Sequence, residues 1–240
     1  MKNAISYLRG REPIVLIALL LIAVGAWGFT WLTAEVLEGS TGSFDRWAVL
    51  AMRNPHDLSQ PLGPPWLAEV GRDVTAIGSV TMIGITILAA AGFLIVNRNY
   101  RRMLILLIST TSGIGLSVFL KSAFDRPRPD IVPHLTPVYT SSFPSGHSMM
   151  SAVVYLTLAV LIAPVLQKFW LRFYVFALAS SVTILVGLSR IYLGVHYPTD
   201  VLAGWAAGLV WALACWMLDR ITKTAVPTKD PAVNLKSSLP

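Results

Sequence analysis

Six long apolar segments alternate with short polar ones along the chain, and none of the six contains Asp, Glu, Lys, Arg or His. The segments are residues 14–34, 76–96, 103–120, 148–166, 173–188 and 201–218, of which the fifth is the shortest. A helix of about 20 apolar residues is long enough to cross the hydrocarbon of a bilayer. The pattern therefore predicts an all-α fold, an integral membrane bundle of six transmembrane helices.

The first apolar segment follows a short basic stretch, so a cleavable signal peptide is the rival interpretation. Val24-Gly25-Ala26 faintly resembles a cleavage site. The apolar region of a signal peptide is only ~7–15 residues long, whereas residues 14–34 approach the ~20 needed to span the membrane. We therefore predict a retained first span.

The connection between the first two spans, residues 35–75, is amphipathic. Residues 44–52 carry apolar side chains on one face at helical spacing, and several prolines follow before Trp66. Amphipathic helices rich in Trp commonly lie in the headgroup layer. We predict an interfacial segment here, with simple anchoring favoured over a role in substrate gating.

Beyond the sixth span the chain changes character. Residues 221–240 are polar and rich in proline, which is typical of a disordered terminus. The predicted domain organisation is therefore a membrane domain over residues 1–220, followed by a disordered cytoplasmic tail.

Composition supports a membrane protein and sets its orientation. The chain is 55% hydrophobic and 13% charged, against about 25% charged residues in soluble domains. Its net charge of +7 is spread over short loops rather than along a stripe, so we expect no nucleic-acid partner. The basic loops 97–102 and 167–172 share one side with both termini, and the positive-inside rule makes that side cytoplasmic.

Three polar segments then fall on the outer face: residues 121–129, 144–147 and 189–200. Together they gather Lys121, Arg126, Arg128, His147, Arg190, His196 and Asp200. A single Lys or Arg at the end of a span often just reaches for the interface. Several cations beside two histidines and an aspartate instead indicate a phosphate site, because Lys supplies a point charge and Arg a planar fork for phosphate oxygens.

The second polar segment, Pro-Ser-Gly-His, immediately precedes the fourth span. Free backbone N–H groups at a helix N-terminus favour an anion. Gly146 allows close approach of the backbone, and the hydroxyl of Ser145 can either cap the helix or donate to phosphate. His147 at this junction can protonate a leaving alkoxide.

His196 and Asp200 are four residues apart at the start of the sixth span. On one helical face, the carboxylate could accept a bond from one ring nitrogen and leave the other free to attack. The alternative is that Asp200 only favours the positive end of the helix. Arg190, at the end of the fifth span, would add a guanidinium to the same pocket.

A metal centre is disfavoured by these residues. Two histidines and one aspartate do not have the spacing of a zinc site, and cations crowd the neighbourhood. Asp125 and Asp130 flank arginines and could pair with them. We therefore expect no metal and no other cofactor.

The motifs Lys121-x6-Arg128-Pro129, Pro144-Ser145-Gly146-His147 and Ser189-Arg190-x5-His196-x3-Asp200 resemble the tripartite signature of the type-2 phosphatidic acid phosphatase superfamily. That superfamily includes bacterial lipid phosphatases and soluble vanadium haloperoxidases. The resemblance implies that His196 is the nucleophile forming a phosphohistidine, that Asp200 orients it, and that His147 is the general acid and later the base. It also implies phosphate-binding roles, which fall on Lys121, Arg128, Ser145, Gly146 and Arg190.

The expected function is a metal-independent lipid phosphatase at the outer face of a bacterial cytoplasmic membrane, with membrane lipids around it. Undecaprenyl diphosphate is the favoured substrate and phosphatidylglycerophosphate the next. A lipid phosphotransferase is one alternative, and a transporter or non-catalytic scaffold is another. Gly204 and Gly208 form a Gly-x-x-x-Gly motif. The motif could pair two copies of the chain or allow close packing within one bundle, so the sequence does not distinguish a monomer from an oligomer.

Overall fold

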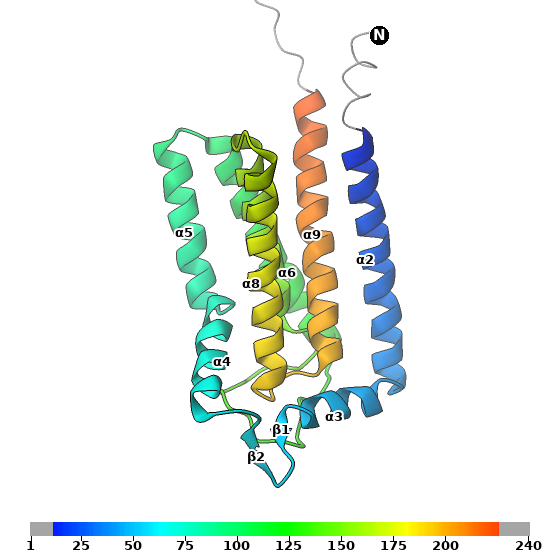
Figure 1. Cartoon of the computed structure of the whole chain (residues 1–240). Helices are drawn as coiled ribbons and strands as arrows, with labels where there is room; N and C mark the ends of the chain where they lie inside the picture. The colour runs from blue at the N-terminus through cyan, green and yellow to red at the C-terminus, as the bar shows by residue number, and fades with distance from the viewer. Residues whose placement is uncertain (1–11, 226–240) are drawn as a thin grey trace, which may run out of the picture.

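The computed structural model describes residues 12–225 and is a bundle of long helices (Figure 1). In chain order the elements are α2 (Glu12–Glu38), α3 (Gly42–Leu50), β1 (Arg53–Asn54), β2 (Asp57–Pro61), α4 (Pro65–Ile77), α5 (Val80–Val96), α6 (Tyr100–Ala123), α7 (Gly146–Ile162), the 3₁₀ turn η1 (Ala163–Val165), α8 (Phe169–Tyr192) and α9 (Pro198–Ala225). Among the described residues, α2, α6, α8, α9 and α7 with η1 are each long and apolar enough to cross a membrane. The predicted helical membrane fold is confirmed.

The sixth candidate span differs from the expected single helix. It consists of α4 and α5, which meet at an angle of 47°. A Cβ atom at Gly78 would clash with Val186 of α8, and the next residue, Ser79, caps α5 by accepting a bond from the amide of Met82 at 3.3 Å. The predicted span over residues 76–96 thus begins in the last turn of one helix and continues in the next.

The connection between the first two spans is more ordered than the sequence analysis anticipated. Helix α3 forms where residues 44–52 predicted an amphipathic helix. The antiparallel strands β1 and β2 follow, paired from Arg53 to Pro61, and were not predicted. Helix α4 has Pro65 at its first position, where a missing N–H and a fixed φ are tolerated.

Helix α7 is the centre of the bundle and packs against α6, α8 and α9. A Cβ atom at Gly204 would lie 2.7 Å from the Ser145 carbonyl oxygen, and one at Gly208 would lie 2.6 Å from that of Met149. The Gly-x-x-x-Gly motif therefore allows α9 to approach the backbone of α7 within one chain, which is the second of the two interpretations considered for it.

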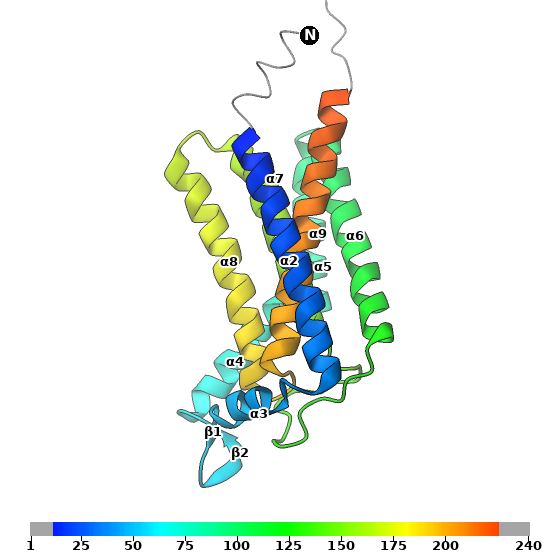
Figure 2. The ribbon, with the colours of Figure 1, turned by 90° about the vertical axis from the view of Figure 1, so that its right-hand side faces the viewer.

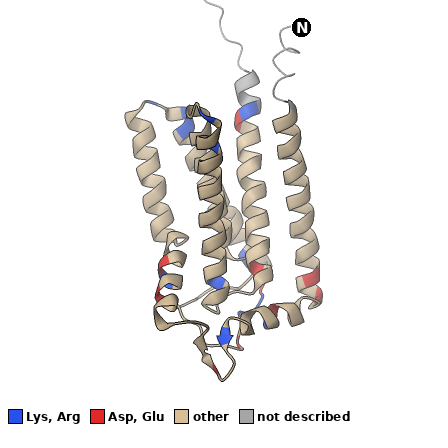
Figure 3. Ribbon diagram, in the orientation of Figure 1, with Lys and Arg blue, Asp and Glu red and all other residues tan. Residues whose placement is uncertain are grey.

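The described chain begins and ends at the same end of the bundle, as Figures 1 and 2 both show. Basic residues of the α5–α6 and α7–α8 connections lie at that end (Figure 3). The loops that contain the three polar segments lie at the other end, together with α3 and the β1–β2 hairpin. Helix α9 runs to Ala225, past the expected domain end at residue 220, and the predicted tail beyond it lies outside the described residues.

Candidate active site

Helix ends position most of the predicted site residues. Lys121 is in the last turn of α6 and Arg190 in the last turn of α8. His147 is in the first turn of α7, and Asp200 is in the first turn of α9. The structure therefore brings the three polar segments to one end of the bundle.

The turn between α8 and α9 carries His196. After Tyr192 the chain reverses at Gly194, whose φ of +73° belongs to the left-handed region that favours glycine. Arg53 of β1 holds this turn, because its Nη1 atom donates to the Tyr192 carbonyl at 2.7 Å. Arg53 is only 2% exposed, and burial lowers the pKa of its guanidinium. No sequence motif pointed to this contact.

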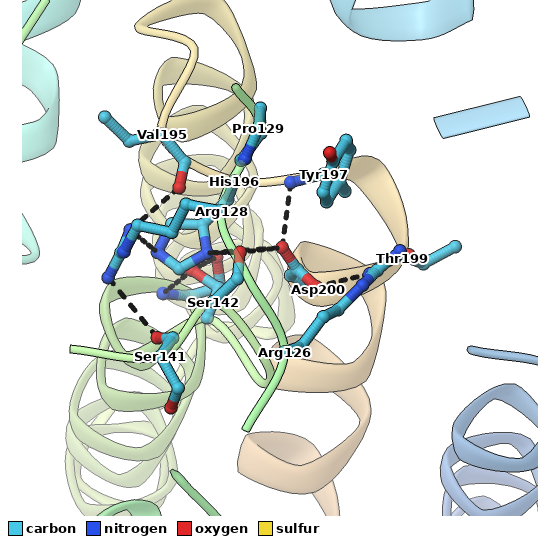
Figure 4. A network of polar contacts seen from close by, with 12 residues as sticks. Arg126, Arg128, Pro129, Ser141, Ser142, Val195, His196, Tyr197, Thr199 and Asp200 are labelled. Carbon is cyan, nitrogen blue, oxygen red and sulfur yellow. Dashed lines mark hydrogen bonds and ion pairs between the residues drawn. The ribbon is translucent and has the colours of Figure 1, made fainter. Parts of the chain in front are cut away.

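The His196 ring has a different partner on each nitrogen (Figure 4). Nδ1 lies 3.4 Å from Oδ2 of Asp200 and also 3.4 Å from Oγ of Ser142, and Nε2 lies 3.2 Å from Nη1 of Arg128. A guanidinium can only donate, so Nε2 accepts and the ring is neutral with its proton on Nδ1. Burial lowers the pKa of His196 to about 4, although the Asp200 carboxylate acts in the opposite direction. Nε2 therefore carries an unprotonated lone pair at neutral pH, which accepts from Arg128.

Asp200 is fully buried and has three further partners. Its Oδ2 atom accepts from the Ser142 hydroxyl at 2.5 Å and from the Tyr197 amide at 2.8 Å, and its Oδ1 atom accepts from Nη1 of Arg126 at 2.6 Å. The bond to the Tyr197 amide is half of a capping box, since Tyr197 precedes the first residue of α9. Asp200 thus lies at the positive end of α9 and, at the same time, close to Nδ1 of His196, so the geometry is compatible with both roles considered for it.

Arg126 forms two ion pairs, but not with the acidic residues that are its neighbours in the sequence. It does not pair with Asp125 or Asp130, but bridges Asp200 and Asp45, with its Nη2 atom 2.7 Å from Oδ2 of Asp45. Burial opposes the charged form of Arg126, but the two carboxylates outweigh it and raise its pKa. Arg126 lies outside the fixed positions of the three motifs, and Asp45 falls within the segment 44–52 that predicted an amphipathic helix.

Arg128 and Lys121 converge on the chain segment that precedes α7. The Nε atom of Arg128 donates to the Thr140 carbonyl and its Nη1 atom to the Val195 carbonyl, each at 2.7 Å. The Ser141 carbonyl accepts from Nζ of Lys121 at 2.8 Å and from Nη2 of Arg128 at 3.4 Å. The two cationic groups of the first motif thus share one acceptor.

Ser145 and Gly146 connect the second motif to the other two. The Ser145 hydroxyl caps α7 by accepting from the Ser148 amide at 3.5 Å, so the capping interpretation applies to it, and it also accepts from the Ser148 hydroxyl at 2.9 Å. The Ser145 amide donates to the Asp200 carbonyl at 2.9 Å. A Cβ atom at Gly146 would lie 3.1 Å from Cε of Lys121, so glycine leaves room for the lysine.

Arg190 and His147 complete the group. Arg190 is 3% exposed. Its Nη1 atom donates to the Thr75 hydroxyl at 3.0 Å, and its Nε atom has no hydrogen-bond partner within residues 12–225. His147 lies close enough to Arg190, His196, Lys121 and Arg128 to interact electrostatically with each of them.

The charges of this cluster favour an anion. Lys121 interacts electrostatically with Arg128 and Arg190 as well as with Asp200. Burial lowers the pKa of Arg128. Three partly desolvated cations beside a neutral imidazole are stabilised by a bound negative charge, and phosphate oxygens match their donors.

The comparisons with known proteins agree with this geometry. Residues 102–221 match the sequence model of the PAP2 superfamily. The chain is 37% identical over 150 residues to phosphatidylglycerophosphatase B of Bacillus subtilis (strain 168), covering 61% of this chain and 72% of the relative. It is 39% identical over 67 residues to the undecaprenyl-diphosphatase of Sulfolobus acidocaldarius, a match that covers 28% of each chain.

A crystal structure has the same fold. It is described as the first transmembrane PAP2-type phosphatidylglycerolphosphate phosphatase from Bacillus subtilis. The structures superpose with a TM-score of 0.71 at 28% identity, over 87% of this chain and 98% of the other. The resemblance drawn from the three motifs is thereby confirmed, and the chain belongs to the PAP2 superfamily as a multi-pass membrane lipid phosphatase.

Proposed function

We propose that this protein hydrolyses a lipid phosphate without a metal ion, through a phosphohistidine formed at His196. The observation that carries the proposal is the state of the His196 ring: Nδ1 faces the Asp200 carboxylate, and the lone pair of Nε2 faces a cation. A nucleophile that is neutral, oriented and adjacent to anion-binding groups suits attack on phosphorus.

The first step is transfer of the phosphoryl group to His196. The phosphoryl oxygens take donors from Arg128, Lys121 and Arg190, and the nucleophile attacks phosphorus in line with the leaving oxygen. A P–N bond forms as the P–O bond breaks. His147, which takes up a proton from solvent when the phosphate anion offsets the surrounding cations, gives that proton to the leaving oxygen. The ring becomes positively charged, and the Asp200 carboxylate beside Nδ1 stabilises that charge.

The second step releases inorganic phosphate. His147, now without its proton, takes one from a water molecule, and the oxygen of that water attacks phosphorus. The P–N bond breaks and His196 returns to its neutral form. Arg128 and Arg190 hold the developing negative charge in both steps, because their guanidinium groups stay fixed by contacts to neighbouring loops and helices.

Phosphatidylglycerophosphate becomes the first substrate to test, ahead of the undecaprenyl diphosphate favoured by the sequence analysis. The similarity to a phosphatidylglycerophosphatase extends over 72% of that relative, whereas the undecaprenyl-diphosphatase match covers 28%. Both lipids present a phosphate at headgroup level, and the site is at one end of the spans, where such a group would lie.

The site is placed at the outer face of the cytoplasmic membrane in this proposal, with both termini in the cytoplasm. Its support is the charge distribution of the described residues. Arg98 and Lys168 lie in connections at the end of the bundle opposite the site, and Arg172 lies in the first turn of α8 at that end. Basic residues are enriched in cytoplasmic loops.

The test is phosphate release from a panel of lipids by the purified protein, with His196→Ala as the inactive reference. We expect turnover of phosphatidylglycerophosphate that is insensitive to EDTA and inhibited competitively by orthovanadate, which mimics a pentacoordinate phosphoryl group. Normal turnover by His196→Ala would refute the nucleophile. Activity lost with EDTA and restored by Mg²⁺ would refute the metal-independent mechanism, and a strict need for an acceptor lipid would reassign the protein as a phosphotransferase.

A further inference from the structure

A carboxylate outside the shared superfamily region takes part in the site. Asp45 is on α3, and its side chain is fully buried although α3 lies in the connection between the first two spans. Its Oδ1 atom accepts from the Thr199 amide at 3.2 Å, and its Oδ2 atom accepts from the Thr199 hydroxyl at 2.7 Å. These bonds attach α3 to the first turn of α9, next to Asp200.

Arg126 joins this carboxylate to Asp200. One guanidinium nitrogen, Nη2, is 2.7 Å from Asp45, and the other, Nη1, is 2.6 Å from Asp200 and 2.8 Å from the Thr199 hydroxyl. The guanidinium carbon lies 4.6 Å from the centre of the Tyr197 ring. Two carboxylates, a hydroxyl and an aromatic face therefore fix the orientation of a single arginine.

The physical role of this arrangement follows from burial. Asp200 is 0% exposed, and a buried carboxylate that loses its cationic partner becomes an uncompensated charge. Arg126 neutralises Oδ1 and fixes the carboxylate plane, which keeps Oδ2 directed toward Nδ1 of His196 while Oδ2 also accepts from the Ser142 hydroxyl and the Tyr197 amide. Asp45 in turn stabilises the charged guanidinium of Arg126 and keeps its Nη1 atom oriented toward Asp200.

We propose that Asp45 and Arg126 are positioning residues for the reaction at His196, so that α3 completes the active site by fixing the carboxylate that orients the nucleophile. This inference rests on the proposed function, since it assumes attack by His196. Neither residue touches the phosphate in the proposed mechanism. Their loss should therefore slow phosphoryl transfer while leaving anion binding in place.

The expected effect separates kcat from KM. Asp45→Asn keeps the shape of the side chain but removes its charge, and we expect kcat to fall by about 10- to 100-fold with KM within about threefold. This loss is below the ~10⁴-fold that follows replacement of the aspartate itself in a Ser-His-Asp triad. Arg126→Met should be at least as severe, and Arg126→Lys should recover part of the rate, since one ammonium restores the charge but not the fork.

The experiment compares these variants with two controls of similar chemistry. Arg46→Met changes the exposed neighbour of Asp45, and Asp125→Asn changes the exposed neighbour of Arg126. For each purified protein we would measure the rate at which ³²P-labelled phosphatidylglycerophosphate labels the enzyme in a single turnover. Orthovanadate affinity and thermal unfolding in the same detergent complete the set.

Support for the proposal is slow labelling of Asp45→Asn with vanadate affinity and unfolding temperature close to wild type, and normal labelling of both controls. The double variant Asp45→Asn/Arg126→Met should lose less than the product of the two single losses, because Asp45 acts through Arg126. Normal labelling by folded Asp45→Asn overturns the proposal, as does a loss explained entirely by a lower folded fraction. If Arg126→Met does not fold, the isosteric Asp45→Asn decides.

The two proposals fail in different ways. Wild-type protein that is never labelled by any lipid of the panel would remove the phosphohistidine mechanism and, with it, this inference. Wild-type protein that is labelled normally, beside an equally fast Asp45→Asn, would remove the inference alone.

Discussion

Nη1 of Arg128 lies 3.2 Å from Nε2 of His196, on the nitrogen opposite the one that faces Asp200. The same Nη1 atom also donates to the Val195 carbonyl. The nucleophilic lone pair of the proposed reaction is thus held toward the cation that would receive the phosphoryl oxygens. Substrate has to take over a contact that the ring already makes.

This contact predicts that Arg128→Lys is not a conservative change. Arg128 reaches the Thr140 carbonyl, the Val195 carbonyl and the His196 ring with different nitrogens, and a lysine ammonium cannot keep that geometry. We expect kcat/KM to fall by about 100-fold or more. Arg46→Lys, on the exposed side of α3, is the matched control. Activity of Arg128→Lys within threefold of wild type would show that charge alone is sufficient.

The buried imidazole predicts a pH dependence of stability. The folded-state pKa of His196 is about 4, below its ordinary value of 6.5, because burial disfavours the charged ring. The unfolded chain therefore binds a proton between pH 6.5 and 4 that the folded one does not. The stabilisation is fully present above pH 6.5 and is lost as the pH falls to about 4, by a total on the order of 3 kcal/mol.

Thermal unfolding between pH 7 and 4 tests this linkage. The unfolding temperature of wild type should fall more steeply over that interval than that of His196→Gln, which cannot titrate. Parallel curves for the two proteins would mean that His196 does not contribute to the acid sensitivity of the fold.

The contact between α9 and α7 predicts that Gly204→Ala is damaging. The new methyl group would lie 2.7 Å from the Ser145 carbonyl oxygen, a backbone atom that cannot move away alone. We expect a loss of about 1–3 kcal/mol in stability and a lower kcat, because the Ser145 amide also bonds to the Asp200 carbonyl. Gly115→Ala is the control, since a Cβ atom there meets nothing within 4 Å. Equal unfolding temperatures for the two variants would contradict the tight packing.

The orientation of the bundle can be read by cysteine labelling. After replacement of Cys215 by Ala, we expect Tyr139→Cys, 92% exposed at the site end, to react with an impermeant maleimide added to intact cells. Lys168→Cys, in the connection between α7 and α8, should react only after the membrane is opened. The reverse pattern would put the site on the cytoplasmic side.

The spans and the three motifs could be predicted because each is a local property of the sequence. Lipid requires uninterrupted apolar helices, so residues 103–120 already indicate α6. Phosphate chemistry requires particular side chains at helix ends, so His196 and Asp200 stand out between apolar segments. The bend between α4 and α5 was missed. It lies at Gly78, which Val186 of α8 approaches closely, and that approach joins segments far apart in the sequence.

The ion pair of Arg126 with Asp45 was missed for the same reason. The two residues are 81 positions apart, and only the packing of α3 against α9 brings them together. Asp125 and Asp130 were nearer in sequence and carried the same charge, so proximity along the chain favoured the wrong partners. Arg53 gave no signal at all, since its acceptor is a backbone carbonyl.

The attachment of α3 to α9 has a consequence for anyone who wishes to shorten this enzyme. A minimal version trimmed to residues 102–221, the part that the superfamily shares, would retain every residue of the three motifs. It would still leave Arg126 with one carboxylate instead of two and Thr199 without its acceptor. Grafting those motifs onto another helical scaffold would therefore require a replacement for Asp45 as well.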